Sequence, residues 1–276
     1  MMKVVADAAT LREAMGRVAR SGAEYTTNFF ASRTEIDQWT ASRALFLLIQ
    51  QQAVLILRRD ADFYRLYHVA SGTAALSAGL GALATAMPTT TIVTDLIGKQ
   101  EGLRAVVNAH VENAFTAYAR LLRMHRISDS SKDEWRIDPA VVHAKADDVQ
   151  CIRVFLERQL DPFSEQVPDI AQLNDAVAKD AVLVMFQDSI LAGVLIHDTT
   201  GFTTTLRYWH VDVRFRGHGI GARLIRTFFR LCADSRRILL WVIADNDDAI
   251  SRYRHYGFHD DSLVDDIMVR QTRLSQ

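Results

Sequence analysis

A glycine-rich junction between two apolar segments constrains this chain more than any other feature. Residues 211–221 read Val-Asp-Val-Arg-Phe-Arg-Gly-His-Gly-Ile-Gly, and a helical pattern begins at once after the glycines. This order predicts a strand, a tight loop and the N-terminus of a helix. The first N–H groups of a helix lack internal acceptors, the helix dipole adds partial positive charge, and glycines allow close approach to the main chain. The junction is therefore a predicted site for a phosphate or pyrophosphate group, which makes an enzyme the first hypothesis.

Composition limits the classes of partner. The chain has 276 residues, enough for two domains, and a net charge of −1, so no overall basic field attracts nucleic acid or an anionic membrane. Its two cysteines, Cys151 and Cys232, form no CxxC motif and suit a reducing compartment, and residues 1–7 lack the apolar core of a signal peptide. We expect a cytoplasmic protein with no metal centre.

One uncharged stretch, residues 69–94, requires a test against a membrane span. Glycines, Pro88 and many small residues dilute its apolar character. We expect a buried helix at 73–87 and a strand at 89–96 instead.

The polar stretch 128–134 separates two apolar-periodic regions and predicts a boundary near 130, with domains 1–130 and 131–276. The C-terminal half predicts an α/β fold, in α+β order around one mixed sheet. Its expected strands are 140–146, 181–186, 191–197, 203–213 and 238–243, and its expected helices are 147–160, 170–178, one from about 220, and 247–256.

The N-terminal half predicts a similar order. Its expected helices are 10–19, 36–51, 73–87 and one from about 100, and its expected strands are 54–58, 63–69 and 90–96. Phe115 follows the last helix as Phe258 follows the last helix of the other half, and an apolar segment comes after each. The half is predicted to be an α/β domain that is a diverged copy, with chance similarity between two α/β halves as the alternative.

A second motif lies downstream of the glycine junction. After the continuous apolar run 238–243, Asn246 opens a helix that contains Ala249 and Tyr253 and ends before Gly257-Phe258. Tyr253 lies two turns beyond Asn246 and so on nearly the same face.

Together these two motifs resemble the GNAT superfamily of acyl-CoA-dependent N-acyltransferases. The family's pyrophosphate motif, Arg/Gln-x-x-Gly-x-Gly/Ala, is matched by Arg214, Gly217 and Gly219, and the resemblance covers about residues 136–272. It implies a GNAT-like mixed central sheet flanked by helices. It also implies transfer of an acetyl group from acetyl-CoA to a primary amine, by direct attack in a ternary complex.

The resemblance further implies a set of residues that bind the co-substrate. These are Val211, Val213, Arg214, Arg216, Gly217, His218, Gly219, Ile220, Gly221 and Asn246. The strand at Val211 and Val213 would pair with the pantetheine amides, and a main-chain N–H near Val211 would polarise the thioester carbonyl. Tyr253 would be the general acid that protonates the departing thiolate. Each residue also has a structural alternative: the arginines as solvated charges, and Tyr253 as a core residue.

The base for the acceptor amine is not evident. Simple alternation places Thr205, Arg207 and Trp209 on the face shared with Val211, and none of them is a base. His210 faces the other way unless a bulge intervenes. The base is therefore His210, a carboxylate from elsewhere in the chain, or water, while Arg207 and Trp209 are candidates for shaping the acceptor pocket.

The N-terminal half lacks the arginines and repeated glycines of the glycine-rich loop at its corresponding strand-to-helix junction. Counting back from Phe115 places His110 at the position of Tyr253 and Leu103 at that of Asn246. We expect a non-catalytic GNAT-like domain that covers or completes the acceptor site.

Two other functions fit parts of the pattern. Gly217-x-Gly219-x-x-Ala222 also matches a dinucleotide-binding fingerprint, with Asp245 for the ribose, but only 54 residues follow Ala222. A non-enzymatic acyl-CoA-binding regulatory protein is the other alternative, because no base is visible. The acceptor, a small-molecule or protein amine, is not named by the sequence.

Overall fold

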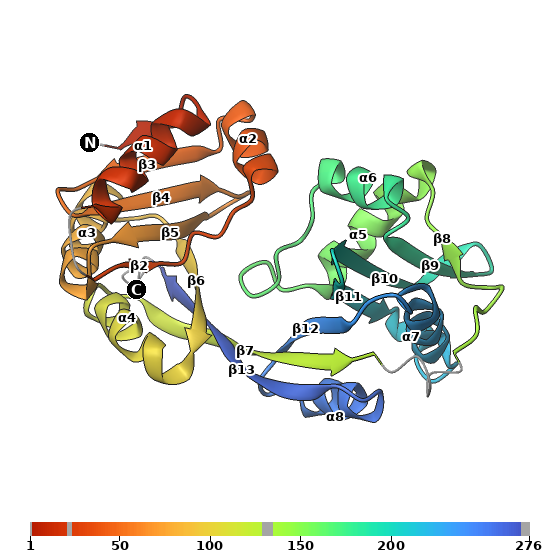
Figure 1. Cartoon of the computed structure of the whole chain (residues 1–276). Helices are drawn as coiled ribbons and strands as arrows, with labels where there is room; N and C mark the ends of the chain where they lie inside the picture. The colour runs from red at the N-terminus through yellow and green to blue at the C-terminus, as the bar shows by residue number, and fades with distance from the viewer. Residues whose placement is uncertain (1, 21–23, 129–134, 272–276) are drawn as a thin grey trace, which may run out of the picture. The chain divides into compact units, whose positions relative to one another are not determined.

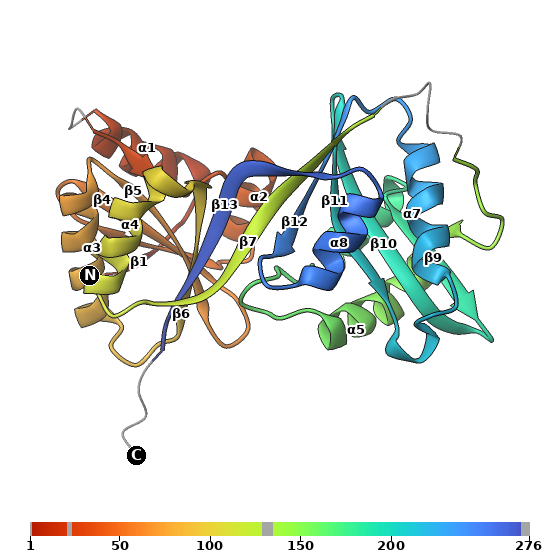
Figure 2. The ribbon, with the colours of Figure 1, turned by 90° about the horizontal axis from the view of Figure 1, so that it is seen from below.

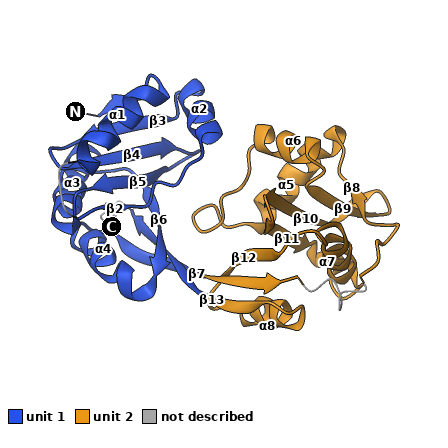
Figure 3. Ribbon diagram, viewed as in Figure 1, with its two compact units in different colours: residues 1–121, 262–276 blue, residues 122–261 orange. Residues whose placement is uncertain are grey.

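The computed structural model describes all residues except 1, 21–23, 129–134 and 272–276. Two compact units are present: one comprises Met1–Leu121 and Ser262–Gln276, and the other Leu122–Asp261 (Figure 3). Strands β7 (Thr116–Ile127) and β13 (His259–Arg270) run across the division, so each contributes residues to both units. The predicted boundary near 130 falls among residues 129–134, outside the described residues.

The C-terminal unit contains a mixed sheet in the order β7-β12-β11-β10-β9-β8 (Figure 1). Neighbouring strands pair antiparallel from β8 to β11, whereas β11 and β12 are parallel. Its further elements are β8 (Val142–His143), α5 (Val149–Gln159), α6 (Ile170–Ala178), β9 (Val182–Gln187), β10 (Ile190–Thr200), β11 (Thr203–Val211), α7 (Ile220–Leu231), β12 (Arg237–Ile243) and α8 (Asp247–His255).

Helices cover both faces of this sheet. Leu183 and Met185 of β9 belong to the cluster that contains the apolar face of α7, and Val182 and Val184 belong to the cluster that contains α5. Alternate residues of one strand thus serve opposite layers, as the pleat requires. Figures 1 and 2 show α5 and α7 on opposite sides of these strands.

The N-terminal unit has a sheet in the order β1-β3-β4-β5-β6-β13, with β2 beside β5. Its elements are β1 (Lys3–Val4), α1 (Ala8–Ala19), β2 (Thr26–Thr27), α2 (Arg33–Ala41), β3 (Leu45–Ile49), β4 (Ala53–Arg59), β5 (Tyr64–Ala70), α3 (Thr73–Ala86), β6 (Ile92–Lys99) and α4 (Gln100–Glu112). The predicted helix 73–87 is confirmed as α3. In the described part of the chain, no helix is long and apolar enough to cross a membrane.

Three predicted elements are wrong in their bounds. The expected helix 36–51 ends at Ala41, and Leu45–Ile49 form β3 instead, because this apolar run pairs along its whole length with β4. Arg43, with φ 53°, turns the chain between them. The expected strand 140–146 shrinks to Val142–His143, and the strand expected to reach 213 ends at Val211.

The closing turns of α4 and α8 are superficially unlike in sequence but alike in structure. Ala114 (φ 65°) and Gly257 (φ 81°) both adopt the left-handed conformation. The N–H of Phe115 then donates to the carbonyl of His110, and that of Phe258 to Tyr253, both at 3.1 Å. The ring pairs His110–Phe115 and Tyr253–Phe258 are T-shaped, with centroids 5.2 and 5.8 Å apart. This shared turn supports the predicted internal duplication.

Gly193 of β10 sets the distance between the sheet and α7. A Cβ added at Gly193 would lie 2.8 Å from Ile220 Cγ2 and 2.9 Å from Leu224 Cδ1. Ile220 and Leu224 are buried core residues that cannot move freely. Helix α7 therefore approaches the sheet closely only because residue 193 has no side chain.

We predict that Gly193→Ala lowers the free energy of unfolding by about 1–3 kcal/mol, since it overpacks this contact. Gly102→Ala in α4 is the matched control, because an added Cβ there meets nothing within 4 Å. The control should be neutral or slightly stabilising. Urea unfolding of both variants measures the difference, and equal stability of the two would contradict the packing argument.

Candidate functional site

The glycine loop between β11 and α7 is open and unusually shaped. Gly217 and Gly219 have φ values of 84° and 75°, and Gly219 is the N-cap of α7. A Cβ added at either glycine would meet nothing within 4 Å, and both residues are exposed. The left-handed conformation favours glycine here, and the empty space leaves the main chain accessible.

Several N–H groups of the loop lack an acceptor. The N–H groups of Arg216 and His218 are exceptions, because they donate long hydrogen bonds of 3.4 Å to the carbonyls of Val213 and Phe215. Within the part of the chain that the structure describes, no acceptor is found for the N–H groups of Gly217, Gly219, Ile220 or Gly221. The first turn of α7 contains no acidic residue. Free N–H groups and the positive end of a helix dipole make this loop suited to an anion.

The two parallel strands part beside the loop. Pairing of β11 with β12 ends at Leu206 and Leu240, although β11 continues to Val211 and β12 to Ile243. The unpaired ends leave a notch between the strands, whose main-chain groups can pair with an extended ligand. We call this opening the C-terminal notch.

A bulge at Arg207 changes which side chains face the notch. Leu206 pairs with His197 and Tyr208 with Ile196, so Arg207 is an extra residue. Trp209 and Val211 still lie on the α7 side, where Gly221 packs against both. The simple alternation that put Thr205 on their face is wrong, because the α7 side before the bulge belongs to Leu206.

Tyr253 lies on the α7 side of the notch, in α8. Its ring centroid is 5.7 Å from Trp209 and 5.8 Å from Phe258. The indole N–H of Trp209 donates to the carbonyl of Gly221 at 3.1 Å and so ties β11 to the first turn of α7. Burial raises the pKa of Tyr253 to about 12, with Arg252 lowering it and the charge of Glu165 raising it further.

The arginines predicted to bind the co-substrate differ in their surroundings. Arg214 forms a two-point ion pair with Asp212, with distances of 3.0 and 2.6 Å, and its side chain is turned back on its own loop. Arg216 and His218 are exposed beside the glycines. Val213 is 66% exposed and lies in a 3₁₀ turn, Val213–Phe215. Because it is not part of β11, it cannot pair with the pantetheine amides as a strand residue would, contrary to the prediction.

Asn246 is the N-cap of α8. Its side-chain oxygen accepts from the N–H of Ala249 at 3.1 Å, which leaves the side-chain amide group as the donor toward any ligand. The cap explains why an asparagine opens this helix.

His210 is a weak base in this setting. Burial, helped by the positive charge of Arg216, lowers the pKa of His210 to about 4. The carboxylate of Asp212 is paired with Arg214, which lowers the pKa of Asp212 to about 2. Neither group is well matched to an amine proton near neutral pH.

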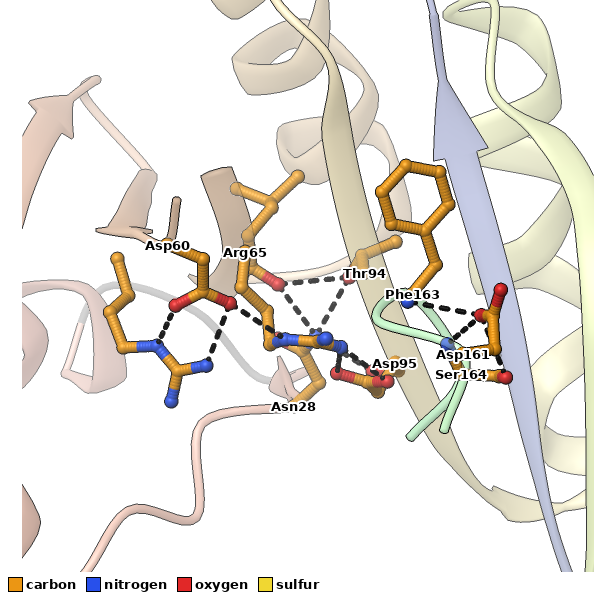
Figure 4. Close-up of polar contacts among 10 residues, drawn as sticks. Asn28, Asp60, Arg65, Thr94, Asp95, Asp161, Phe163 and Ser164 are labelled. Atoms are coloured by element: carbon orange, nitrogen blue, oxygen red, sulfur yellow. Dashed lines mark hydrogen bonds and ion pairs between the residues drawn. The ribbon is translucent and has the colours of Figure 1, made fainter. Parts of the chain in front are cut away.

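The N-terminal unit has a corresponding notch, and Asn28 fills it (Figure 4). Strand β5 pairs with β6 at Tyr64–Ile92 and Arg65–Val93, and beyond these residues the two strands part. The amide nitrogen of Asn28 donates to the carbonyls of Leu66 (3.3 Å) and Asp95 (2.9 Å), and its oxygen accepts from the N–H of His68 (2.6 Å). Asn28 is 8% exposed, so main-chain groups of both strands are occupied from within the chain.

His110, counted to the position of Tyr253, packs against His68 of β5 as Tyr253 packs against Trp209 of β11. His68 and His110 lie with ring centroids 5.8 Å apart, close to the 5.7 Å of Trp209 and Tyr253. Burial lowers the pKa of His68 to about 3 and that of His110 to about 4. Leu103, counted to the position of Asn246, lies inside α4 and caps no helix.

Sequence analysis did not single out Asn28 or Glu165, and it allowed for a bulge in this strand without placing it at Arg207. Asn28 binds β5 and β6, which are distant from it in the chain, and no local pattern marks Glu165 or the position of the bulge. Among the described residues, no cluster of three or more His, Cys, Asp or Glu side chains could hold a metal ion.

The class follows from this geometry. The chain has a mixed sheet whose parallel strands part beside a glycine loop, with helices on both faces, which is an α/β fold. Residues 149–258 match the model of the acetyltransferase (GNAT) family, and the chain carries a domain of that family. No curated protein matches the chain.

Solved structures extend the likeness in fold to the N-terminal unit. A GCN5-related N-acetyltransferase from Sphaerobacter thermophilus is 12% identical, with a TM-score of 0.60, over 99% of this chain and 96% of that one. A tandem GNAT protein from the clavulanic acid biosynthesis pathway is 14% identical, with a TM-score of 0.59, over 100% and 99%. A GNAT-family acetyltransferase from Colwellia psychrerythraea is 10% identical, with a TM-score of 0.55, over 98% and 99%. The whole chain therefore has a GNAT-type fold in tandem.

We predict that Gly219→Val weakens binding of CoA at least tenfold, because a branched side chain would cover the free N–H groups. Gly201→Val is the matched control: Gly201 also has a left-handed φ (58°) and open space around it, but it lies in the β10–β11 turn. Both variants carry a similar backbone strain of about 1–3 kcal/mol. Isothermal titration calorimetry should show normal affinity only in the control, and equal affinities would disprove close contact between loop and phosphate.

Proposed function

We propose that this protein transfers the acetyl group of acetyl-CoA to a primary amine, by direct attack of the amine in a ternary complex. The observation that carries the proposal is the row of free N–H groups at Gly217, Gly219, Ile220 and Gly221 next to the C-terminal notch. An anion site and an open strand edge, side by side, suit a ligand with a pyrophosphate at one end and an amide-bearing arm at the other.

The loop binds one part of the co-substrate and the notch binds another. The N–H groups of Gly217 to Gly221 hold the pyrophosphate, with Arg216 and His218 exposed beside it. The free end of β11 at Val211 pairs with the pantetheine amides and supplies an N–H to the thioester oxygen. The side-chain amide of Asn246 donates to the same arm.

Two residues that were predicted to bind the co-substrate have a more limited role in this proposal. Val213 and Arg214 take part through the 3₁₀ turn that shapes the loop, rather than through strand pairing or a free guanidinium group.

Tyr253 is the proton donor to the sulfur. With a pKa of about 12, its phenol stays protonated at neutral pH. A free thiol has a pKa of about 8.5, so proton transfer to an exposed thiolate would be unfavourable. The burial that raises the pKa of the phenol also raises that of a thiolate beside it, which reduces this mismatch. The phenol therefore stabilises the thiolate as its charge develops.

We predict that Tyr253→Phe lowers kcat by about 10²–10⁴-fold and leaves the Kd for acetyl-CoA nearly unchanged, because only the proton donor is removed. Tyr256→Phe is the matched control: this buried ring also packs against Trp209, with centroids 5.8 Å apart.

Release of free thiol from acetyl-CoA in the presence of a panel of amines is the measurement. An unchanged kcat would remove Tyr253 from the mechanism. Binding of acetyl-CoA without thiol release from the wild-type protein would favour a non-enzymatic acyl-CoA-binding protein, and stabilisation by NAD(H) alone would favour a dinucleotide-binding protein.

We further propose that the N-terminal unit binds no acyl-CoA. Asn28 already makes the main-chain hydrogen bonds that a pantetheine arm would make in that notch. The junction before α3 contains one glycine, Gly72, and no arginine. The acceptor amine in this proposal belongs to a small molecule or a protein.

We predict a stoichiometry of one acetyl-CoA per chain, because Asn28 fills the N-terminal notch and no described side chain fills the C-terminal notch. Calorimetric titration of the wild-type protein should fit one site, and Gly219→Val should weaken that site without revealing another. A second site that survives in Gly219→Val would show that the N-terminal notch opens to the ligand.

A further inference from the structure

Several hydrogen bonds hold the connection between α5 and α6, which Figure 1 draws as a long loop. Asp161 Oδ1 accepts from the N–H groups of Phe163 (3.0 Å) and Ser164 (2.8 Å), as Figure 4 shows. Arg153 of α5 donates to the carbonyls of Val167 and Pro168. The loop is thus held both by its own first carboxylate and by the helix that precedes it.

Glu165 has a fixed place in this loop. Its Oε2 accepts from the N–H of Asp161 at 3.0 Å, and its own N–H donates to the carbonyl of Asp161 at 2.8 Å. The side chain is half-buried. Burial raises the pKa of Glu165 above its ordinary value, the N–H of Asp161 opposes this, and the Asp161 charge adds to it. The second carboxylate oxygen, Oε1, makes no hydrogen bond to any residue in the described ranges.

The loop is tied to the strand that borders the C-terminal notch. The phenol of Tyr208 donates to the carbonyl of Gln166, the residue after Glu165. Tyr208 packs with the α5 layer, and the next residue, Trp209, packs on Tyr253 from the α7 side. Tyr208 lies beyond Leu206, in the part of β11 that no longer pairs with β12. A carboxylate from one layer and a phenol from the other therefore lie near the same opening of the sheet.

We propose that Glu165 is the general base that takes the proton from the acceptor ammonium group, an assignment that rests on the proposed acetyltransferase function. The acceptor enters from the α5–α6 side, and the sulfur lies on the side of Tyr253. An acid and a base on opposite sides of one thioester can act without exchanging protons with each other.

The proton balance closes with these two groups. Glu165 accepts one proton from R–NH₃⁺, the free amine forms the C–N bond, and the C–S bond breaks. Tyr253 gives its proton to the sulfur, and the second proton of the nitrogen returns to the phenolate as the amide forms. Glu165 then releases its proton to water.

The other charged groups around this site are less suited to the task. Asp161 accepts hydrogen bonds within its own loop, and Arg153 binds loop carbonyls. On the neighbouring elements lie His210 in β11, Arg216 in the loop after β11, and Arg252 beside Tyr253 in α8. Two are permanent cations and the imidazole is a weak base, so Glu165 is the group with both a free oxygen and a raised proton affinity.

The test is Glu165→Gln, because the amide oxygen of glutamine can still accept from the N–H of Asp161 while the charge is lost. Glu112→Gln, at the exposed end of α4, is the matched control. At pH 7 we expect kcat/KM of Glu165→Gln to fall about 10²-fold, and the Kd for acetyl-CoA and the thermal unfolding midpoint to match the control.

Two readouts separate a base from a merely structural residue. Without a base, the reaction depends on the free amine, so the activity of Glu165→Gln should rise about tenfold per pH unit toward the pKa of the acceptor. The defect should also be smaller with glycinamide, an α-amine of pKa about 8, than with Nα-acetyl-lysine amide, whose side-chain amine has a pKa of about 10. Glu165→Asp should retain the pH profile of the wild-type protein at a lower rate.

The outcomes are distinguishable from failure of the proposed function. If the wild-type protein releases thiol and Glu165→Gln matches it in rate and pH profile, Glu165 is not the base, although the transferase function stands. A defect that is equal at every pH and for both amines also overturns the assignment. If the wild-type protein releases no thiol with any amine, the proposed function fails and this inference fails with it.

Discussion

The parting of β11 from β12 is the feature on which the proposed function depends. Beyond Leu206 and Leu240 the two strands no longer satisfy each other's main-chain groups, and these groups become available to a ligand. Helix α7 begins at the same end of β11, so its free N–H groups lie next to that opening. Gly193 lets α7 pack closely, and the Trp209–Gly221 hydrogen bond ties its first turn to β11.

The two units differ in what binds the main-chain groups that are left unpaired where two strands part. Strands that part leave unpaired N–H and C=O groups, which are costly unless something binds them. In the N-terminal unit the side chain of Asn28 supplies a donor and an acceptor to β5 and β6, much as an amide of a ligand would. In the C-terminal unit no described side chain makes such bonds to the ends of β11 and β12. Two units of similar fold can therefore leave this notch open in one unit and fill it with a side chain in the other.

Burial determines the acid–base properties of the candidate site. The same loss of solvent raises the pKa of Tyr253 and of Glu165 and lowers that of His210, because it disfavours every charged form. The proposed transfer from a thioester to an amine uses a phenol that holds its proton and a carboxylate with increased proton affinity. A neutral imidazole of low pKa adds little to it.

The sequence by itself determined the parts of the site that are local in the chain. The glycine loop, the start of α7, the Asn246 cap and the turn from Tyr253 to Phe258 all depend on residues within a few positions of each other. The tertiary structure alone decided the bulge at Arg207, the strand at Leu45–Ile49 and the places of Asn28 and Glu165. Asn28 binds strands far away in the chain, and the other three depend on which segments pair or pack together, which local periodicity does not encode.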